Sequence, residues 1–544
     1  MKLVSVAEMR AIEKEADSRG LTFAQMMENA GMGLAGVIMD ALGDEGVQPL
    51  AGLVGPGNNG GDALVALAAL AQMGWETRAY LVRPRPQDDP LLQRFLDAGG
   101  SVISAEDDAD LEQLRELLSR SGVVLDGVLG TGAQLPLRPE VARVLAAVQE
   151  MQNDYAVVAV DCPSGMDCDT GEVAPETLRA DLTVCMAAPK VGMLRFPAFD
   201  YLGQMDVVDI GLDANMPAWA AVQDGVVTAE DVQGVLPERR SDAHKGTFGT
   251  AMVAAGSMNY PGAALLAAKA AYRTGAGLVR VAVPGPLQAM LAGHLPEATW
   301  VLLPHEMGAI AQDAYDVIAK NLDRVTALLV GPGLGTEDPT AGFIKQMASG
   351  KPNHPARGAI GFSFGARTED AKKEEPPHAL PALVVDADGL KLLAKVPDWH
   401  KLIPAPAVLT PHPGEMAQMT GLNVDEIQAD RVETARRFAR EWGHVVVLKG
   451  ALTVIASPEG HARLIPVASP ALARAGTGDV LAGLIVGMRA QGVSAFDAAC
   501  AGAWIHAQAG LSAASWLGSD ASVLAGDVLD SIAEILQSLE SGEE

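Results

Sequence analysis

The sequence predicts two α/β domains, each with helices on both faces of a mainly parallel sheet. Short apolar runs alternate with helical patterns along both halves of the chain, and several runs end in glycine-rich turns. The chain has 544 residues, which is longer than a domain with a single hydrophobic core usually is. Strand–helix alternation is typical of doubly wound parallel sheets. We therefore expect one domain at residues 1–215 and another at residues 226–540, with a linker within residues 211–225.

The apolar runs and helical patterns locate the expected elements. In the first half we expect strands at residues 50–54, 77–82, 123–125, 156–160, 182–185 and 205–208. Helices are expected there at residues 5–19, 63–73, 90–98, 111–119 and 139–151. In the second half we expect strands at residues 250–255, 278–283, 327–330, 382–385, 407–409, 445–448 and 452–455. Residues 349–381 combine lysine, proline and glutamate without periodicity, which indicates a surface insertion.

The net charge of the chain indicates which classes of binding partner are unfavourable. The chain carries 40 basic and 68 acidic residues, a formal net charge of −28. That field repels nucleic-acid phosphates and anionic lipid, so we expect neither a nucleic-acid nor a membrane partner. The first residues contain no long apolar run, and the four cysteines form no CxxC pair. We expect a cytoplasmic protein whose phosphate sites rest on backbone N–H groups and a few local cations.

A glycine-rich turn follows the first expected strand. Its sequence is Gly55-Pro56-Gly57-Asn58-Asn59-Gly60-Gly61-Asp62, and it opens a helix whose N–H groups can face an anion. Its glycine spacing satisfies the dinucleotide pattern GxGxxG. The second strand, however, ends in Arg83-Pro84-Arg85 where that pattern wants an acidic residue. On these residues alone an NADP-dependent dehydrogenase and a purely structural helix start both stay open.

Two later loops in the first half place polar residues at strand ends. Asp126 begins one loop, and Asp161 begins another that contains Ser164. Loops at the carboxyl ends of parallel strands converge on one crevice. Side-chain oxygens of Asn59, Asp126 and Ser164 would suit a hard monovalent cation there.

The strongest short motif in the second half is Ala475-Gly476-Thr477-Gly478-Asp479. Its glycines can aim backbone N–H groups at one anion, and the helix that follows adds its positive end. Asp479 is then placed to take a proton from a hydroxyl that attacks a phosphoryl group, although a helix-capping role is the alternative. Glu415, within Pro411-His412-Pro413-Gly414-Glu415, could organise Mg²⁺ through water. The sequence contains no Walker A loop, which excludes P-loop chemistry.

Five motifs of the first half occur together in order. They are Met27-Glu28-Asn29-Ala30-Gly31, Asn58-Asn59-Gly60-Gly61-Asp62, Asp126-xxx-Gly130-Thr131-Gly132, Asp161-x-Pro163-Ser164-Gly165 and Pro189-Lys190-x-Gly192. Together they resemble the NAD(P)H-hydrate epimerase family, a Rossmann-like domain, over residues 1–212. The resemblance implies substrate contacts at Asn58, Asn59, Gly60, Gly61, Asp62, Gly130, Thr131, Gly132, Ala133, Gln134, Leu135, Pro136 and Asp161. It also implies potassium at Asn59, Asp126 and Ser164. The hydrated nicotinamide ring carries a hydroxyl group on C6, and inverting that carbon needs proton transfer. We choose Asp161 for this transfer, with Lys190 as the second candidate.

A second set of motifs spans residues 230–535. It comprises His244-Lys245-Gly246-xx-Gly249, Tyr260-Pro261-Gly262-Ala263-Ala264, Gly275-Ala276-Gly277-Leu278-Val279, Gly331-Pro332-Gly333-Leu334-Gly335 and Asp386-Ala387-Asp388-Gly389-Leu390. With His412 and Asp479 it resembles the NAD(P)H-hydrate dehydratase branch of the ribokinase-like fold. The resemblance implies substrate contacts at Ala263, Gly333, Gly335, His412 and Asp479. It implies an adenine-nucleotide site at Lys449, Gly450, Ala451, Leu452, Thr453, Gly476, Thr477 and Gly478.

The two resemblances imply one repair function. The substrates would be the hydrated dinucleotides NADHX and NADPHX, with ADP or ATP, Mg²⁺ and K⁺ as cofactors. Phosphorylation of the C6 hydroxyl followed by elimination would restore the reduced nicotinamide. We also expect a homo-oligomer. The main alternative is a ribokinase-like sugar or vitamin kinase fused to a dinucleotide-binding domain, and another is a non-catalytic dinucleotide sensor in the first half.

Overall fold

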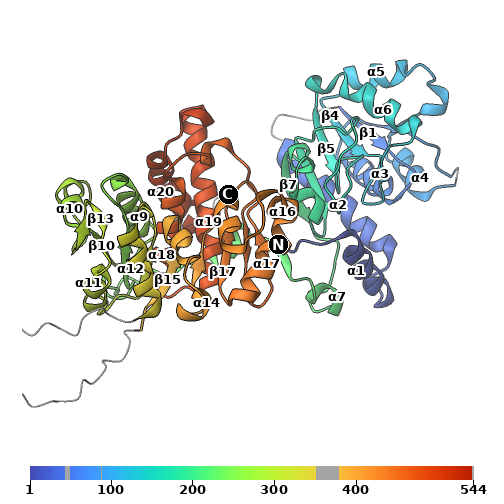
Figure 1. The fold of residues 1–544 in the computed structure, drawn as a ribbon. Coiled ribbons are helices and arrows are strands. Elements are labelled where there is room, and N and C mark those ends of the chain that lie inside the picture. The colour runs from blue at the N-terminus through green and yellow to red at the C-terminus, as the bar shows by residue number, and fades with distance from the viewer. Residues whose placement is uncertain (43–48, 87, 351–378, 542–544) are drawn as a thin grey trace, which may run out of the picture. The chain divides into compact units, whose positions relative to one another are not determined.

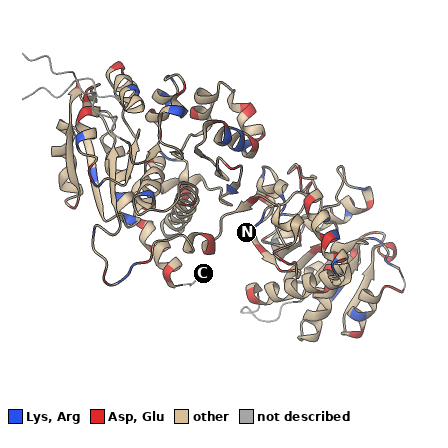
Figure 2. Ribbon diagram, turned by 90° about the horizontal axis from the view of Figure 1, so that it is seen from below, with Lys and Arg blue, Asp and Glu red and all other residues tan. Residues whose placement is uncertain are grey.

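The computed structural model describes residues 1–42, 49–86, 88–350 and 379–541 (Figure 1). The chain divides into two compact units, Met1–Gly225 and Val226–Glu544. Acidic residues outnumber basic ones on the helices and loops of both units (Figure 2). None of the helices in these described ranges is long and apolar enough to cross a membrane.

The first unit is built on a sheet that, within the described residues, has seven strands in the order β3-β2-β1-β4-β5-β6-β7. All neighbours in it are parallel. The strands are β1 (Leu50–Val54), β2 (Thr77–Leu81), β3 (Ser101–Ser104), β4 (Val123–Gly127), β5 (Ala156–Val160), β6 (Leu182–Met186) and β7 (Gln204–Val208). The order reverses between β1 and β4, so a crevice opens at the carboxyl ends of these two strands.

Helices cover both faces of this sheet, because successive strand residues point to opposite sides. Leu50 and Val54 belong to one core with the helices α1 (Val6–Ser18), α2 (Phe23–Leu42) and α3 (Asn58–Gln72). Ala51 and Leu53 belong to a second core with α5 (Glu112–Ser119) and α6 (Pro139–Gln149). The remaining helices of the unit are α4 (Pro90–Asp97), α7 (Pro217–Ala220) and the 3₁₀ turns Ala105–Asp107, Gln152–Asp154, Val191–Leu194 and Ala198–Tyr201.

Residues 211–225, which we expected to be a linker, are packed into the first unit instead. Met216 and Val222 are buried in its core, and α7 lies against α1. The Leu3 N–H donates to the Asp224 carbonyl at 3.1 Å, which ties the N-terminal segment to the same stretch. The sequence shows little periodicity here because the segment packs as a turn and one short helix.

The second unit contains a sheet with ten strands among the described residues, in the order β11-β10-β9-β14-β15-β16-β17-β18-β19-β8. Pairing is parallel from β11 to β17 and antiparallel from β17 to β19. The strands are β8 (Asp224–Val226), β9 (Thr250–Ala254), β10 (Leu278–Pro284), β11 (Thr299–Leu303), β14 (Ala327–Val330), β15 (Ala382–Val385), β16 (Val408–Leu409), β17 (Val445–Leu448), β18 (Val454–Ala456) and β19 (Ala462–Leu464). A separate hairpin is formed by β12 (His305–Glu306) and β13 (Ala309–Ile310).

One face of this sheet is covered by the alanine- and glycine-rich helices α9 (Pro261–Arg273), α18 (Thr477–Ala490), α19 (Ala495–Leu517) and α20 (Ala525–Ser541). Their small side chains allow close approach: a Cβ atom on Gly483 would lie 2.3 Å from the Ala267 carbonyl oxygen. The other helices are α8 (Ala229–Gln233), α10 (Gly285–Leu291), α11 (Ala314–Lys320), α12 (Asp338–Ser349), α13 (Asp388–Leu393), α14 (Trp399–Leu402), α15 (Pro413–Thr420), α16 (Val424–Ala429) and α17 (Arg431–Trp442). Short 3₁₀ turns occupy Ala292–His294, Pro470–Leu472 and Asp520–Ser522.

The predicted α/β class with mainly parallel sheets is confirmed. Every expected strand and helix is present within a few residues, but α2 and the strands β3, β8, β11, β12, β13 and β19 were not expected. The sequence of α2 is rich in alanine, glycine and methionine, so its polar and apolar faces are weakly separated. Most of the insertion expected at residues 349–381 lies outside the described residues.

The close crossing of α2 and α3 gives a prediction about stability. A Cβ atom on Gly31 of α2 would lie 2.4 Å from the Val65 Cβ of α3, whereas one on Gly36 would meet no atom within 4 Å. We expect Gly31→Ala to destabilise the first unit by about 1–3 kcal/mol through overpacking. The matched control Gly36→Ala should stabilise it by about 0.5–1 kcal/mol, because alanine is the better helix former. Urea unfolding measures both, and equal effects would contradict a tight crossing at Gly31.

Candidate active sites

The glycine-rich turn of the first unit lies where β1 and β4 end side by side. Val54 is in register with Gly127, and the Gly55 N–H donates to the Gly127 carbonyl at 3.1 Å. A Cβ atom on Gly55 would lie 1.9 Å from the Val128 carbonyl oxygen, so only glycine fits this approach. The chain then enters α3 at Asn58, which places the helix N-terminus at the carboxyl edge of the sheet.

Asn59, Asp126 and Ser164, the three residues expected to bind potassium, meet around the Leu129 carbonyl. The Ser164 hydroxyl donates to the Asp126 carboxylate at 2.5 Å, and the Ser164 N–H donates to its second oxygen at 2.8 Å. The Asn59 amide donates to the Leu129 carbonyl at 3.0 Å. Complete burial raises the pKa of Asp126 despite these bonds. Amide, carboxylate, hydroxyl and backbone carbonyl oxygens are therefore gathered in one place, which fits a monovalent cation.

Asp161 and Lys190 form a buried ion pair at the same edge. Asp161 directly follows β5, and its φ of 63° places it in the left-handed region, a conformation that is costly for a residue other than glycine. Its carboxylate accepts the Met186 N–H at 2.9 Å and pairs with the Lys190 ammonium. Burial lowers the pKa of Lys190, but the charge and hydrogen bond of Asp161, together with the neighbouring thiols of Cys185 and Cys162, raise it overall. Lys190 is therefore a cation that offsets the charge of Asp161.

Two further carboxyl groups lie beside this pair. Burial, followed by the charge of Asp161, raises the pKa of Asp62 well above its usual value and also raises that of Glu13. Both side chains line one pocket together with Asn58 and Met186. The sequence singled out Asp62 but missed Glu13, which comes from α1 and carries no local motif.

The loop expected at residues 130–136 lines a second pocket on the other side of the glycine-rich turn. Gly132, Ala133, Gln134 and Pro136 contribute to it together with Arg83. Arg85, by contrast, donates to the Gly55 and Gly57 carbonyls at 2.7 and 3.2 Å and pairs with Asp89 at 2.6 Å. Of these two arginines, only Arg83 faces the pocket and can meet a phosphate. Arg85 supports the turn.

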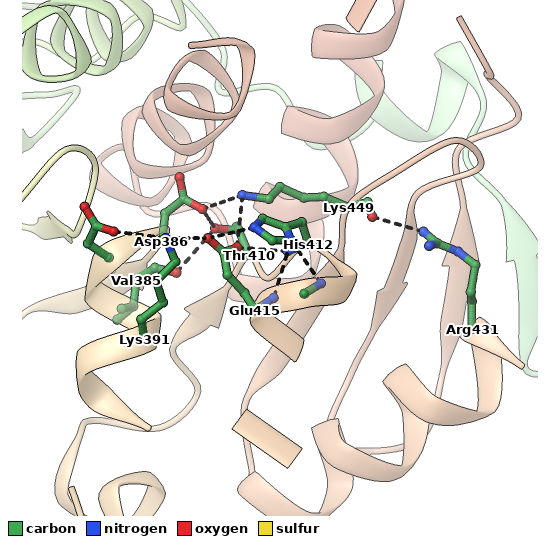
Figure 3. Close-up of polar contacts among 10 residues, drawn as sticks. Val385, Asp386, Lys391, Thr410, His412, Glu415, Arg431 and Lys449 are labelled. Carbon is green, nitrogen blue, oxygen red and sulfur yellow. Dashed lines mark hydrogen bonds and ion pairs between the residues drawn. The ribbon is translucent and has the colours of Figure 1, made fainter. Parts of the chain in front are cut away.

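In the second unit three successive parallel strands end in polar residues that bond to one another (Figure 3). Asp386, Thr410 and Lys449 directly follow β15, β16 and β17. Asp386 accepts hydrogen bonds from the Thr410 hydroxyl and from the Lys449 ammonium, both at 2.7 Å. Burial lowers the pKa of Lys449, but the charges of Asp386, Glu415 and Asp479 and the hydrogen bond to Asp386 together raise it.

Asp479 stands in the first turn of α18, after Gly476 with a φ of 93°. Its carboxyl group makes no hydrogen bond or ion pair with any described residue, so it does not cap the helix. Burial raises the pKa of Asp479 to about 7, and the negative charge of Asp386 adds to this effect. A carboxyl group with such a pKa and free lone pairs is suited to general base catalysis near neutral pH.

His412 and Glu415 form a capping box at the start of α15. The His412 Nδ1 accepts the Gly414 N–H at 3.0 Å, and the Glu415 carboxylate accepts the His412 N–H at 3.0 Å. Burial opposes the charge of Glu415, yet the hydrogen bonds from His412 and the Lys449 charge keep its pKa low. Glu415 thus has a structural role besides the magnesium role expected for it. His412 keeps its side chain half exposed at the mouth of the site.

The expected substrate contacts of the second unit lie close to one another. A Cβ atom on Gly333 would lie 2.8 Å from that of Ala263, and the Gly335 N–H donates to Asp388 at 2.9 Å. Asp388 in turn pairs with Lys391 at 3.0 Å, and Lys391 lies 3.9 Å from Glu415. The Gly333–Gly335 turn is thereby connected to the capping box of α15.

The expected nucleotide residues fall in two places. Residues 450–453 turn the chain from β17 into β18, and the Thr453 hydroxyl donates to the Gly450 carbonyl at 2.8 Å. Gly476, Thr477 and Gly478 form the other part, which we call the anion hole. The Thr477 hydroxyl is used to bind the Leu472 and Arg474 carbonyls at 3.0 and 2.9 Å. The Thr477 backbone N–H also donates to the Arg474 carbonyl at 3.4 Å, so the Gly478 backbone N–H is the candidate anion contact.

Comparison with known proteins identifies the family. Residues 251–534 match the model of the NAD(P)H-hydrate dehydratase family, and residues 23–192 match that of the YjeF-related protein N-terminus. A bifunctional NAD(P)H-hydrate repair enzyme of Moorella thermoacetica is 35% identical over 99% of this chain and 97% of its own. The chain belongs to the bifunctional NAD(P)H-hydrate repair enzymes. The Escherichia coli member is 31% identical over 92% of this chain and 88% of its own.

Among solved structures, an ADP/ATP-dependent NAD(P)H-hydrate dehydratase of Bacillus subtilis, co-crystallised with ATP and Mg²⁺, is 31% identical to this repair enzyme. It covers 58% of this chain and 98% of its own, with a TM-score of 0.45. The family inferred from the sequence motifs is thus confirmed, and with it a repair enzyme with an epimerase and a dehydratase domain.

The carboxyl groups of the second site can hold magnesium only through water. No group of three or more His, Cys, Asp and Glu side chains among the described residues could hold a metal directly. The carboxyl groups of Asp386, Asp388, Glu415 and Asp479 nevertheless outnumber the two lysines among them. The excess negative charge fits a divalent cation held mainly by water and phosphate oxygens.

The raised pKa of Asp479 gives a prediction for pH dependence. A base works when deprotonated, so kcat/KM for dehydration should rise with pH to a plateau, with an apparent pKa of about 7. The same shift means that ionised Asp479 destabilises the folded state, increasingly from its unfolded pKa up to about 7. Asp479→Asn should therefore unfold at a higher temperature than the wild type at about pH 8, with a smaller gain at about pH 5. The exposed Asp530→Asn, in α20, serves as the control. A gain independent of pH would contradict a buried, shifted Asp479.

Proposed function

We propose that residues 1–215 interconvert the R and S hydrates of NADH and NADPH at C6. Residues 226–540 then dehydrate the S epimer with ADP or ATP. The observation that carries the second assignment is the unbonded carboxyl group of Asp479 beside the anion hole and Lys449. The buried Asp161–Lys190 pair beside the glycine-rich turn supports the first. The protein acts in the cytoplasm as a homo-oligomer in this proposal.

The epimerase step follows from the chemistry of C6, which carries a hydroxyl group and is bonded to the ring nitrogen. Inversion requires that one of these bonds break and re-form on the other face, with proton transfer at each stage. Asp161 takes and returns that proton, while Lys190 holds its carboxylate toward the crevice. The hydrated dinucleotide lies across the turn at residues 58–62 and the loop at residues 130–136.

Potassium belongs to the first site in this proposal. Asn59, Asp126, Ser164 and the Leu129 carbonyl would hold it, and the cation would supply a fixed positive charge beside the dinucleotide. Its removal should leave a buried carboxyl group uncompensated, which costs stability.

The dehydratase step is a phosphoryl transfer followed by an elimination. Asp479 removes the proton of the C6 hydroxyl, and the hydroxyl oxygen then bonds to the terminal phosphorus of the nucleotide. The bond from that phosphorus to the bridging oxygen breaks at the same time. AMP leaves when ADP is the donor, and ADP leaves when ATP is the donor. Phosphate then leaves C6 while a proton passes from C5 to water, which restores the C5=C6 double bond of NADH or NADPH. The anion hole binds the transferred group, residues 449–453 contact the nucleotide, and Ala263, Gly333, Gly335 and His412 contact the substrate. Glu415 would hold Mg²⁺ through water, and the cation would supply positive charge to neutralise the phosphates.

A sugar or vitamin kinase uses the same phosphoryl-transfer groups and would accumulate a stable phosphorylated product. The relatives of this chain are named as repair enzymes over nearly its whole length, which does not favour that alternative.

Separate variants should remove the two activities independently. Asp161→Ala should abolish epimerisation above the spontaneous rate and spare dehydration of the S epimer. Asp479→Asn should lower dehydration by about 10²–10⁴-fold, the usual contribution of a general base, and spare epimerisation. Recovery of reduced-nicotinamide absorbance measures dehydration, and chromatography of the two hydrates measures epimerisation. The exposed Asp200→Ala and Asp530→Asn are the controls. Loss of both activities in either variant would contradict independent sites.

The potassium site predicts a cation-specific stabilisation. K⁺ should raise the unfolding temperature of the first unit relative to choline at equal ionic strength, because a ligand that binds only the folded state stabilises it. Asp126→Asn should remove the difference between the two salts. A K⁺ effect that persists in this variant would place the cation elsewhere.

A further inference from the structure

The ammonium group of Lys449 lies inside the anion hole. A Cβ atom built on Gly478 would be 3.5 Å from the Lys449 Nζ. The lysine side chain is 17% exposed, and its pKa is influenced by the charge of Asp479. Lys449 thus presents a positive charge to the point at which the backbone N–H groups of α18 converge.

The fold fixes both ends of Lys449. Its N–H donates to the Pro411 carbonyl at 2.9 Å, and the half-buried Arg431 guanidinium donates to the Lys449 carbonyl at 3.3 Å. At the other end, the ammonium donates to the Asp386 Oδ1 at 2.7 Å and lies 3.8 Å from Glu415 (Figure 3). The position of the Lys449 ammonium is therefore fixed by contacts at both ends of the side chain.

Asp386 is the group that sets this place. It is 1% exposed, lies between its neighbours at the end of β15, and also accepts the Thr410 hydroxyl. The α15 capping box already uses Glu415, whose oxygens are farther from the ammonium. Of the two carboxylates within 4 Å of the ammonium, Asp386 is thus the closer, at 2.7 Å against 3.8 Å for Glu415.

We propose that Asp386 is a positioning residue that holds the Lys449 ammonium in the anion hole, where it meets the phosphoryl group during transfer. The proposal rests on the dehydratase function proposed above and deepens it. A phosphoryl group carries more charge on its outer oxygens during transfer, and a preorganised cation in a poorly solvated site stabilises that charge. Lys449 is then a contact of the transferred phosphoryl group, beyond a general contact of the nucleotide.

A purely structural reading makes a different prediction. If Lys449 only neutralised buried carboxylates, its replacement would alter folding stability and leave phosphate recognition unchanged. The two readings therefore predict different binding of ligands with and without phosphate. They also differ on whether the effects of replacing Asp386 and Lys449 on turnover depend on each other.

The first experiment measures nucleotide binding to the full chain by calorimetry. Asp386→Asn/Lys449→Met removes both buried charges, so it leaves no unpaired partner of this pair. It should bind ADP at least about tenfold more weakly than the wild type, while adenosine binding changes less than about twofold. Lys401→Met removes an exposed ion pair with Asp398 and should change neither. Equal loss for ADP and adenosine, or no loss, would overturn the contact with phosphate.

The second experiment measures turnover. Asp386→Asn and Lys449→Met should each lower kcat for dehydration by about 10²-fold, as expected for one preorganised group. The double variant should fall no further than Lys449→Met alone, because Asp386 acts through Lys449. Thr410→Val, which keeps both charges, should have a smaller effect than Asp386→Asn. Multiplying effects in the double variant would overturn the positioning role. A wild-type protein without dehydration would instead contradict the proposed function, and the binding experiment would still test Lys449.

Discussion

A lysine paired with a buried aspartate at the carboxyl edge of a parallel sheet recurs in both units, as Lys190–Asp161 and as Lys449–Asp386. Neither charge of such a pair could be buried alone, because desolvation would cost several kcal/mol, on the order of the whole stability of a domain. Each pair is satisfied further by the backbone or a hydroxyl, through Met186 in one unit and Thr410 in the other. The strand ends are thereby fixed relative to one another, and the loops that bind ligands start from these fixed points.

The acidic composition of the chain opposes the binding of anionic ligands, and local groups in both units must overcome this repulsion. A protein with a net charge of −28 repels dinucleotides and adenine nucleotides at long range. Both units place a helix N-terminus after glycines, at α3 and at α18, so that backbone N–H groups supply part of the attraction. Local cations supply the remainder: Arg83 in one pocket and Lys449 in the anion hole. Arg85 does not serve as a phosphate contact, because its guanidinium donates to a backbone carbonyl of the glycine-rich turn.

Carboxyl groups perform opposite tasks in these sites according to their surroundings. Glu415 is kept charged by His412 and Lys449 although it is buried, whereas burial and Asp386 hold the pKa of Asp479 near neutrality. The first suits a group that orders cations, and the second suits a group that exchanges a proton. The raised pKa of Asp479 also means that its ionised, active form is the less stable one, which illustrates how catalytic groups can reduce stability.

Local patterns in the sequence predicted most of the strands, the turn before α3, the start of α18 and the position of Asp161 and Asp479 at the active edge. These features depend on residue periodicity, glycine conformation and the convergence of parallel strand ends, which neighbouring residues determine. The pairing of Lys449 with Asp386, 63 residues apart, depends instead on the order of β15, β16 and β17. The approach of Glu13 to Asp62, the diversion of Arg85 and the packing of residues 211–225 are likewise tertiary. Charge interactions between distant segments exist only after the sheet order is set, so only the tertiary structure decided which groups pair and which stay free for chemistry.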